Sequence, residues 1–436
     1  MRFATLSCRL ALFGAMTAAV GLIAPIAPVT AQPTAYAAAS HTTLTYVAGS
    51  SVKLEQIIGD CDWAHLASTG LCMQTASQTI SRYDIEGNGL GYSFEGQNKL
   101  LFLFGDTIGT RTNYHGHDPI GWSTSTNPEA GLLLNFYTNT DGSPLFVEPP
   151  GIKMGPDDVP NSGIFVNNKI YLVCNTGSDV SLSNPHAHDY SVLASFDDTT
   201  DTFSTGRTIS TIPGGHFIIN SLHTVPAGIG TAQPGVALFG LGDYRATDVY
   251  LAVVPASQIE SGQGTVYFAG ISHGRPVWTS KEASAVPVVV DNPLNGPAWP
   301  HDKPTIGNVS VTYSRDVGLW LMTYDGGRQS DATTGVYFTY ATAPWGPWSK
   351  PQLIFNAKRD HGFGVFIHNQ DYHPPGPAGP TIGNNDPSTT RGGDFAPQMI
   401  ERFTKLTGNT LAIYYTMSTW NPYTVVKMRS SFKVTH

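Results

Sequence analysis

The chain contains few charged residues, few cysteines and almost no helical periodicity. Of its 436 residues, 13% are charged and four are cysteines. Apolar residues seldom recur at the i, i+3, i+4 and i+7 spacing of an amphipathic helix, which excludes a helical bundle. After the first 40 residues no apolar run is long enough to span a bilayer. The mature chain is therefore expected to have no membrane span.

Residues 1–39 have the pattern of a secretory signal peptide. Arg2 and Arg9 precede an apolar stretch over residues 10–29, and alanine-rich sequence with possible cleavage points after Ala31 and Ala37 follows. We therefore expect a secreted or periplasmic protein.

The charge balance is acidic. The formal net charge is −8, and loss of Arg2 and Arg9 with the leader makes the mature chain −10. An acidic chain argues against nucleic acid and anionic membranes as partners. A neutral glycan is compatible with this charge.

Three cysteines follow the leader, and each has an expected role. In an oxidising compartment Cys61 and Cys72 are expected to form a disulfide within an N-terminal segment over residues 40–74. Cys174 ends an apolar run, which predicts a buried, inert thiol rather than a nucleophile.

Short apolar runs broken by Gly, Asn, Asp and Pro recur from Tyr92 to the C-terminus. With 46 glycines and 31 prolines they predict an all-β domain over residues 75–436. Paired strands with tight turns are expected at Gly91–Asp106, Gly163–Asn175, Val236–Val254, Asn308–Asp325 and Ala396–Met417. The starts of these five units are 72, 73, 72 and 88 residues apart. This spacing favours a five-bladed β-propeller; six blades or two sandwiches are the alternatives.

The longer last interval holds a Pro- and Gly-rich insertion, His373–Asp386. It is interpreted as a surface loop that either overhangs a site or has no function.

The run from Lys99 to Thr107 ends in a carboxylate, Asp106, flanked by glycine and threonine. A buried strand holds its last side chain rigidly, which suits an acid or base of a carbohydrate-active protein. The alternative is an Asp that starts a turn by accepting bonds from nearby amides.

The predicted strand ends resemble one another. If these ends face one side of the propeller, their polar groups converge near its axis. Each carboxylate is alternatively a turn former, and each aromatic a core residue. The residues expected to bind substrate there are Asp243, Tyr244, Arg245, Asp325, Trp420, Asn421 and Tyr423.

Other chemistries find little support in the sequence. The histidines show no zinc-ligand spacing, and there is no serine-hydrolase elbow or phosphate-binding loop. No metal and no cofactor are therefore predicted. A structural divalent cation is left open, with His301 and Asp302 either contributing to a central cation site or forming an exposed loop pair.

Several motifs together resemble the DUF4185 domain over about residues 75 to 432. They are Gly87-Asn-Gly-Leu-Gly91, Phe102-Leu-Phe-Gly-Asp-Thr107, Pro160-Asn-Ser-Gly163, Gly242-Asp-Tyr-Arg245, Tyr267-Phe-Ala-Gly270, Pro344-Trp-Gly-Pro-Trp348 and Met417-Ser-Thr-Trp-Asn-Pro-Tyr423. That family is similar to the endo-D-arabinanases of glycoside hydrolase family 183. The resemblance implies a five-bladed propeller that hydrolyses D-arabinofuranose chains of cell-wall polysaccharide with inversion.

The resemblance implies that Asp106 is one of two catalytic acids, and that the other belongs in the first motif. There this sequence has Gly89 in place of the expected Asp. Inversion needs two carboxyl groups roughly 6.5 to 9.5 Å apart. Glu86 or Asp84 is our first hypothesis for the second group.

Two further hypotheses account for the missing acid. An acid from another blade, Asp243 or Asp325, comes second. The third is loss of activity, which would make the chain a non-catalytic glycan-binding propeller. Our interpretation is an endo-acting hydrolase of a furanose-rich cell-wall polysaccharide, with glycan binding without cleavage as the alternative.

Overall fold

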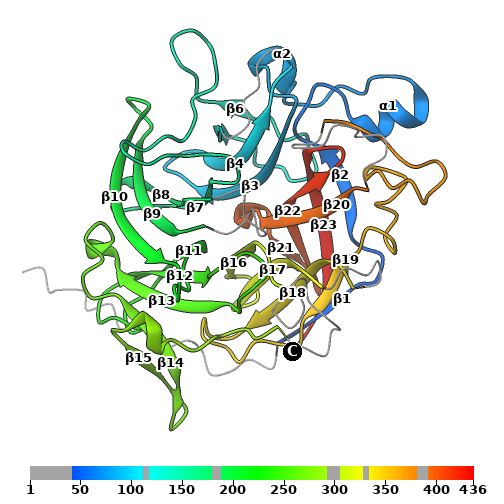
Figure 1. Ribbon diagram of the computed structural model, residues 1–436. Coiled ribbons are helices and arrows are strands. Elements are labelled where there is room, and N and C mark those ends of the chain that lie inside the picture. Colours follow the sequence, from blue (N-terminus) through cyan, green and yellow to red (C-terminus); the bar gives the residue numbers. More distant parts are fainter. Residues whose placement is uncertain (1–41, 111–116, 179–187, 292–304, 328–332, 381–390) are drawn as a thin grey trace, which may run out of the picture. The chain divides into compact units, whose positions relative to one another are not determined.

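Antiparallel strands form most of the computed structural model, which describes residues 42–110, 117–178, 188–291, 305–327, 333–380 and 391–436. The expected signal peptide, His301 and Asp302, and residues 381–386 of the insertion lie outside this part of the chain. The described strands form five sheets around a central axis (Figure 1). The prediction of an all-β, five-bladed propeller is confirmed.

Each of the first four blades is a meander of consecutive strands, numbered outward from the axis. Blade 1 contains β3 (Gly87–Glu95), β4 (Leu100–Ile108), β5 (Ile120–Ser123) and β6 (Asn135–Phe136). Blade 2 contains β7 (Val159–Val166), β8 (Lys169–Thr176), β9 (Tyr190–Asp197) and β10 (Thr202–Thr211). Blade 3 contains β11 (Ile219–Val225), β12 (Gly235–Leu241), β13 (Tyr250–Pro255), β14 (Val266–Ser272) and β15 (Arg275–Thr279). Blade 4 contains β16 (Val309–Ser314), β17 (Leu319–Gly326), β18 (Gly335–Ala341) and β19 (Gln352–Phe355).

Blade 5 joins the two ends of the described chain. Its strands β20 (Gly393–Met399), β21 (Lys405–Thr407), β22 (Thr410–Trp420) and β23 (Thr424–Thr435) come from the C-terminal part. β1 (Thr43–Tyr46) and β2 (Val52–Gln56) both pair with β23. Backbone hydrogen bonds between the two ends thus close the ring within blade 5.

The core consists of apolar clusters between neighbouring blades. In β4 the side chains alternate, so Leu100, Phe102 and Phe104 pack toward blade 5 while Leu101 and Leu103 pack toward blade 2. This period-2 alternation, with both faces covered, explains why the strand is apolar throughout.

One repeat unit begins a strand earlier than predicted. The Val236–Val254 hairpin exists as β12 and β13, but blade 3 starts with β11 at Ile219. The first strands of the blades start at Gly87, Val159, Ile219, Val309 and Gly393. The predicted spacing was near-regular only because the third unit was counted from a second strand and the others from first strands. Loops of different length between strands cause the irregularity.

The short helices lie outside the sheets. α1 (Trp63–Thr69) is capped by Asp62, whose side chain accepts from the amides of Ala64 and His65. α2 (Thr79–Tyr83) precedes blade 1. The single-turn helices in the described ranges are η1 (Ala256–Gln258), η2 (Glu282–Ser284) and η4 (Glu401–Phe403). No helix within the described ranges is long and apolar enough to cross a membrane.

Both cysteine predictions are confirmed. Cys61 and Cys72 form a disulfide around α1. Cys174 is a free thiol, fully buried in β8, and burial raises its pKa, which makes it a poor nucleophile.

Candidate functional site

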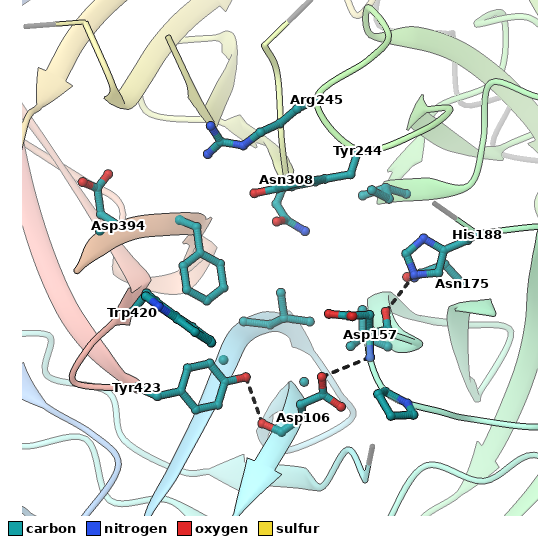
Figure 2. Close-up of a pocket in the computed structure, with 18 of the residues that line it drawn as sticks. Asp106, Asp157, Asn175, His188, Tyr244, Arg245, Asn308, Asp394, Trp420 and Tyr423 are labelled. Atoms are coloured by element: carbon teal, nitrogen blue, oxygen red, sulfur yellow. Dashed lines mark hydrogen bonds between the residues drawn. The ribbon is translucent and has the colours of Figure 1, made fainter. Parts of the chain in front are cut away.

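A cavity of about 650 Å³ opens where the first strands begin and the second strands end (Figure 2). Antiparallel pairing brings these two kinds of strand end to the same face of the propeller. The pocket is lined by Gly89, Leu90, Gly105, Asp106, Pro156, Asp157, Val159, Asn175, His188, Ile219, Tyr244, Arg245, Asn308, Arg391, Gly392, Gly393, Asp394, Phe395, Trp420 and Tyr423.

Asp106, near the end of β4, stands on one side of the pocket. Its side chain is 6% exposed, and its Oδ2 accepts the backbone N–H of Asp157 at 3.1 Å. Asp157 has a positive φ of 66° in the turn before β7, and its carbonyl oxygen contacts Nε2 of His188 at 2.7 Å. This amide bond fixes the orientation of the Asp106 carboxyl group toward blade 2.

A second carboxyl group lies near Asp106. Asp118 is 1% exposed, and neither of its carboxyl oxygens accepts a hydrogen bond from a described residue. Burial, with the nearby charges of Asp106 and Asp158, holds its pKa well above the usual range. A protonated Asp118 avoids a second negative charge beside Asp106.

The far side of the pocket contains a buried ion pair between blades 3 and 4. Nη2 of Arg245 donates to Oδ2 of Asp325 at 2.6 Å, and the hydroxyl of Tyr244 donates to the same oxygen at 3.2 Å. Asp325 is fully buried, and its Oδ1 also accepts the amides of Asn308 (2.7 Å) and Ala396 (3.3 Å).

This network determines the pKa of Arg245. It also leaves space only for glycine at position 307, beside Asp325. Burial opposes the charged form of Arg245, but Tyr244 and Asp325 raise its pKa overall. A Cβ at Gly307 would lie 2.2 Å from Oδ2 of Asp325. Asp325 therefore lies behind Arg245 and holds it in place.

Asp394, the second residue of β20, lies across the pocket from Asp106 (Figure 2). It is 8% exposed, and its Oδ2 is buried without a hydrogen bond from the described residues. Burial raises the pKa of Asp394 to about 7, with a further contribution from Asp325, while Arg245 opposes the shift. Near neutral pH this carboxyl group is therefore partly protonated and able to donate a proton.

Aromatic side chains from blade 5 complete the wall. Trp420 and Tyr423 pack edge to face with ring centroids 5.7 Å apart. The hydroxyl of Tyr423 donates to the carbonyl oxygen of Asp106 at 2.9 Å. Blade 5 thus fixes the backbone at Asp106 in blade 1. Burial holds the pKa of Tyr423 well above its usual range.

Tyr423 also occupies the space beside Gly89. A Cβ at position 89 would lie 2.8 Å from the tyrosine hydroxyl oxygen and 3.3 Å from the ring of Phe395. Any side chain at position 89 would force Tyr423 to move. The glycine and the tyrosine therefore fit together at this corner of the pocket.

The structure brings together five of the residues expected from the sequence: Asp106, Tyr244, Arg245, Trp420 and Tyr423 all line the pocket. Asp325 contacts Arg245 from behind. Asp243 and Asn421 do not line the cavity. Asn421 instead accepts the amide of Gly379 on Oδ1 and the amide of His368 on its carbonyl oxygen, which holds the loop before blade 5.

Glu86 and Asp84, the two residues expected to partner Asp106, are not among the residues that line the pocket. Asp84 accepts the amide and the hydroxyl of Thr110, and the amide of Glu86 donates to Ile108. In the antiparallel register these partners follow Asp106 along the chain, so the two acids lie beyond it. Burial and Asp84 raise the pKa of Glu86.

Six polar residues of the pocket were not predicted: Asp157, Asn175, His188, Asn308, Arg391 and Asp394. The sequence contained a sign of Asp394, because this residue lies two positions before the expected start of the last hairpin at Ala396. In the structure it pairs with Thr419 near the end of β22. Asp157 and His188 had none, since both lie in loops between strands. No group of three or more His, Cys, Asp or Glu residues in the described parts of the chain is arranged to hold a metal ion.

Comparison with family models gives one match. The model described as "Domain of unknown function (DUF4185)" matches residues 74–429. None of the curated proteins is similar to the chain in sequence.

Several solved structures are similar to the chain at low sequence identity. An exo-β-1,3-galactanase from Phanerochaete chrysosporium is 10% identical with a TM-score of 0.42, over 87% of this chain and 64% of the galactanase chain. An endo-1,5-α-L-arabinanase from Thermotoga petrophila is 10% identical with a TM-score of 0.42, over 81% and 75%. A family 43 glycoside hydrolase from Bacillus licheniformis is 10% identical with a TM-score of 0.38, over 79% and 71%. The chain thus spans less than two thirds of the galactanase's length.

Proposed function

The chain belongs to the DUF4185 family, and we propose that it is a secreted glycoside hydrolase acting within furanose-rich cell-wall polysaccharide. The observation that carries the proposal is the pair of dissimilar carboxyl groups in one pocket. Asp106 accepts an amide hydrogen bond, whereas Asp394 is buried with a pKa of about 7. Two carboxyl groups in different surroundings suit the separate acid and base roles of glycoside hydrolysis.

The proposed reaction assigns one role to each group. Asp106 as general base takes a proton from a water molecule, whose oxygen attacks the anomeric carbon. Asp394 as general acid gives its proton to the glycosidic oxygen as the bond to the anomeric carbon breaks. The products are a new reducing end, with inverted configuration, and a free hydroxyl on the leaving sugar.

The rest of the pocket suits a neutral sugar chain. Trp420 and Tyr244 offer aromatic surface, and Arg245 and Asn308 carry donors that can bond sugar hydroxyls. The resemblance to endo-D-arabinanases supports D-arabinofuranan as the polymer, and the disulfide fits export to an oxidising compartment.

A second candidate function is glycan binding without cleavage. It is favoured by Gly89, because the hydroxyl of Tyr423 lies within 2.8 Å of the position that a Cβ there would take. In that case the carboxylates would only bind hydroxyls.

The test is incubation of the mature protein with mycobacterial arabinogalactan, and with plant L-arabinan as a control polymer, followed by measurement of released reducing ends. Wild type should release reducing ends from the first polymer, and Asp106→Asn and Asp394→Asn should not. Glu86→Gln is the matched control, because it removes a nearby carboxylate outside the pocket, and it should retain the wild-type rate. Binding without release in wild type would establish the second candidate.

A further inference from the structure

A partly exposed apolar surface adjoins the pocket on the side of blade 5. It consists of Phe363, Val365, Tyr372 and Arg391, and is called the Phe363 surface below. The guanidinium of Arg391 lies 5.7 Å from the centroid of the Phe363 ring, and the rings of Phe363 and Tyr372 are 5.4 Å apart. Val365 is 52% exposed.

The loop that carries this surface is internally bonded. The amide of Gly364 donates to the carbonyl of Ile367 at 3.0 Å, and the amide of Asn369 donates to Pro375 at 2.8 Å. A Cβ at Gly364 would lie 2.9 Å from the carbonyl oxygen of Pro374, so this close approach requires glycine. The rings are thus presented by a tightly folded loop.

The same loop is fastened to the pocket wall. The amide of His368 donates to Asn421 at 2.9 Å, that of Gly392 donates to His368 at 2.7 Å, and that of Tyr423 donates to Pro380 at 2.7 Å. Trp420 and Tyr423, which flank Asn421 and Pro422 in the chain, line the pocket. Loop and wall therefore form one rigid piece, which suits a binding surface.

Arg391 makes the surface continuous with the pocket. It lines the cavity together with Gly392 and Gly393, immediately before Asp394, and its guanidinium contacts Phe363 outside the cavity. A polymer bound across Asp394 and leaving the pocket on this side would run over Arg391 and onto Phe363.

We propose that the Phe363 surface is a subsite for the sugar units of a polysaccharide that extend beyond the pocket. The proposal rests on the proposed glycosidase function. Aromatic rings pack against the C–H faces of sugar rings, and an arginine held over a ring donates to their hydroxyls. Such a subsite makes the protein prefer long chains over short ones.

The test compares polymer with a short oligosaccharide of the same sugar, which fills only the pocket. In Phe363→Leu, kcat/KM on the polymer should fall about 3- to 10-fold, the worth of one stacking contact, and kcat/KM on the oligosaccharide should be unchanged. The matched control is Tyr83→Leu, which also removes a ring beneath an arginine, with Cζ of Arg82 4.8 Å from its centroid, but outside the pocket. Tyr83→Leu should change kcat/KM on neither the polymer nor the oligosaccharide.

Thermal unfolding of each variant and retardation in a gel containing the polymer complete the design. Equal changes of Phe363→Leu on both substrates, or no change on either, would overturn the subsite. If wild type cleaves nothing, the proposed hydrolase function fails. In that case weaker polymer retardation of Phe363→Leu than of Tyr83→Leu would still support the subsite, and equal retardation would overturn it.

Discussion

The two sides of the pocket place a carboxyl group in different surroundings. On the side of blades 1 and 2, Asp106 accepts an amide from the neighbouring blade and has the buried Asp118 close by. On the side of blades 4 and 5, Asp394 is buried beside the Asp325–Arg245 pair, and its pKa rises to about 7. The residue type is the same, so the difference between the two carboxyl groups comes from their surroundings.

This comparison explains how a propeller can build a two-carboxylate site without neighbouring acids in the sequence. Asp106 lies near the end of the second strand of blade 1, whereas Asp394 is the second residue of the first strand of blade 5. Ring closure makes these two blades adjacent in space, and Tyr423 ties them together through the carbonyl of Asp106.

The largest expected effect is on the side of Asp106. Asp106→Asn should lower the hydrolytic rate by at least about a hundredfold, because it removes the proposed base while keeping the shape of the side chain. Steady-state kinetics on arabinogalactan check this. An active Asp106→Asn with wild-type kinetics would mean that the two sides do not differ in the way described.

Next is the support behind Arg245. Asp325→Ala should lower the free energy of unfolding by about 3–5 kcal/mol, because it leaves a buried arginine without its counter-ion. Urea unfolding measures this loss. Glu260→Ala, which removes the exposed partner of Lys169, is the control and should cost less than about 1 kcal/mol. Equal losses in the two variants would contradict a stabilising role of Asp325.

The raised pKa of Asp394 predicts a pH dependence of stability. The folded protein binds the proton up to about pH 7, whereas the unfolded chain loses it near 3.8. The protonated form therefore contributes stability at low pH, and this contribution declines as the pH rises through that window. Relative to Asp394→Asn, wild type should lose on the order of 4 kcal/mol across it, because the pKa rises from 3.8 to about 7. If the free energies of unfolding of the two proteins changed in parallel with pH, the pKa of Asp394 would not be raised in the folded state.

A smaller effect is expected for the bond that joins the two blades. Tyr423→Phe should cost about 1 kcal/mol of stability and lower kcat several-fold with little change in KM, because Asp106 loses its backbone tether. Tyr415→Phe removes another buried hydroxyl, bonded to Ser430 away from the pocket. It should cost similar stability and leave kcat unchanged. A kcat decrease in both variants would point to general loosening instead.

The sequence predicted what depends on strand pattern. Alternation and turn residues located the hairpins, and the end of an apolar strand located Asp106. The same reasoning placed Tyr244, Arg245, Trp420 and Tyr423 at one mouth of the propeller. The positions of these residues can be predicted directly from where a strand ends.

Residues whose position depends on contacts between blades were harder to predict. Asp394 lies two residues before Ala396, where the last hairpin was expected to begin, and the Pro- and Gly-rich insertion precedes it. Glu86 and Asp84 are close to Asp106 in the hairpin, but the register places them beyond its end. Asp157 reaches Asp106 only through a turn of the next blade.

The most direct test of the account uses a dinitrophenyl glycoside of an arabinofuranose oligosaccharide, whose leaving group needs no proton. Asp394→Asn should be at least about a hundredfold slower than wild type on the polymer but close to wild type on this glycoside, whereas Asp106→Asn should be slow on both. Equal losses of Asp394→Asn on the two substrates would contradict its role as the acid.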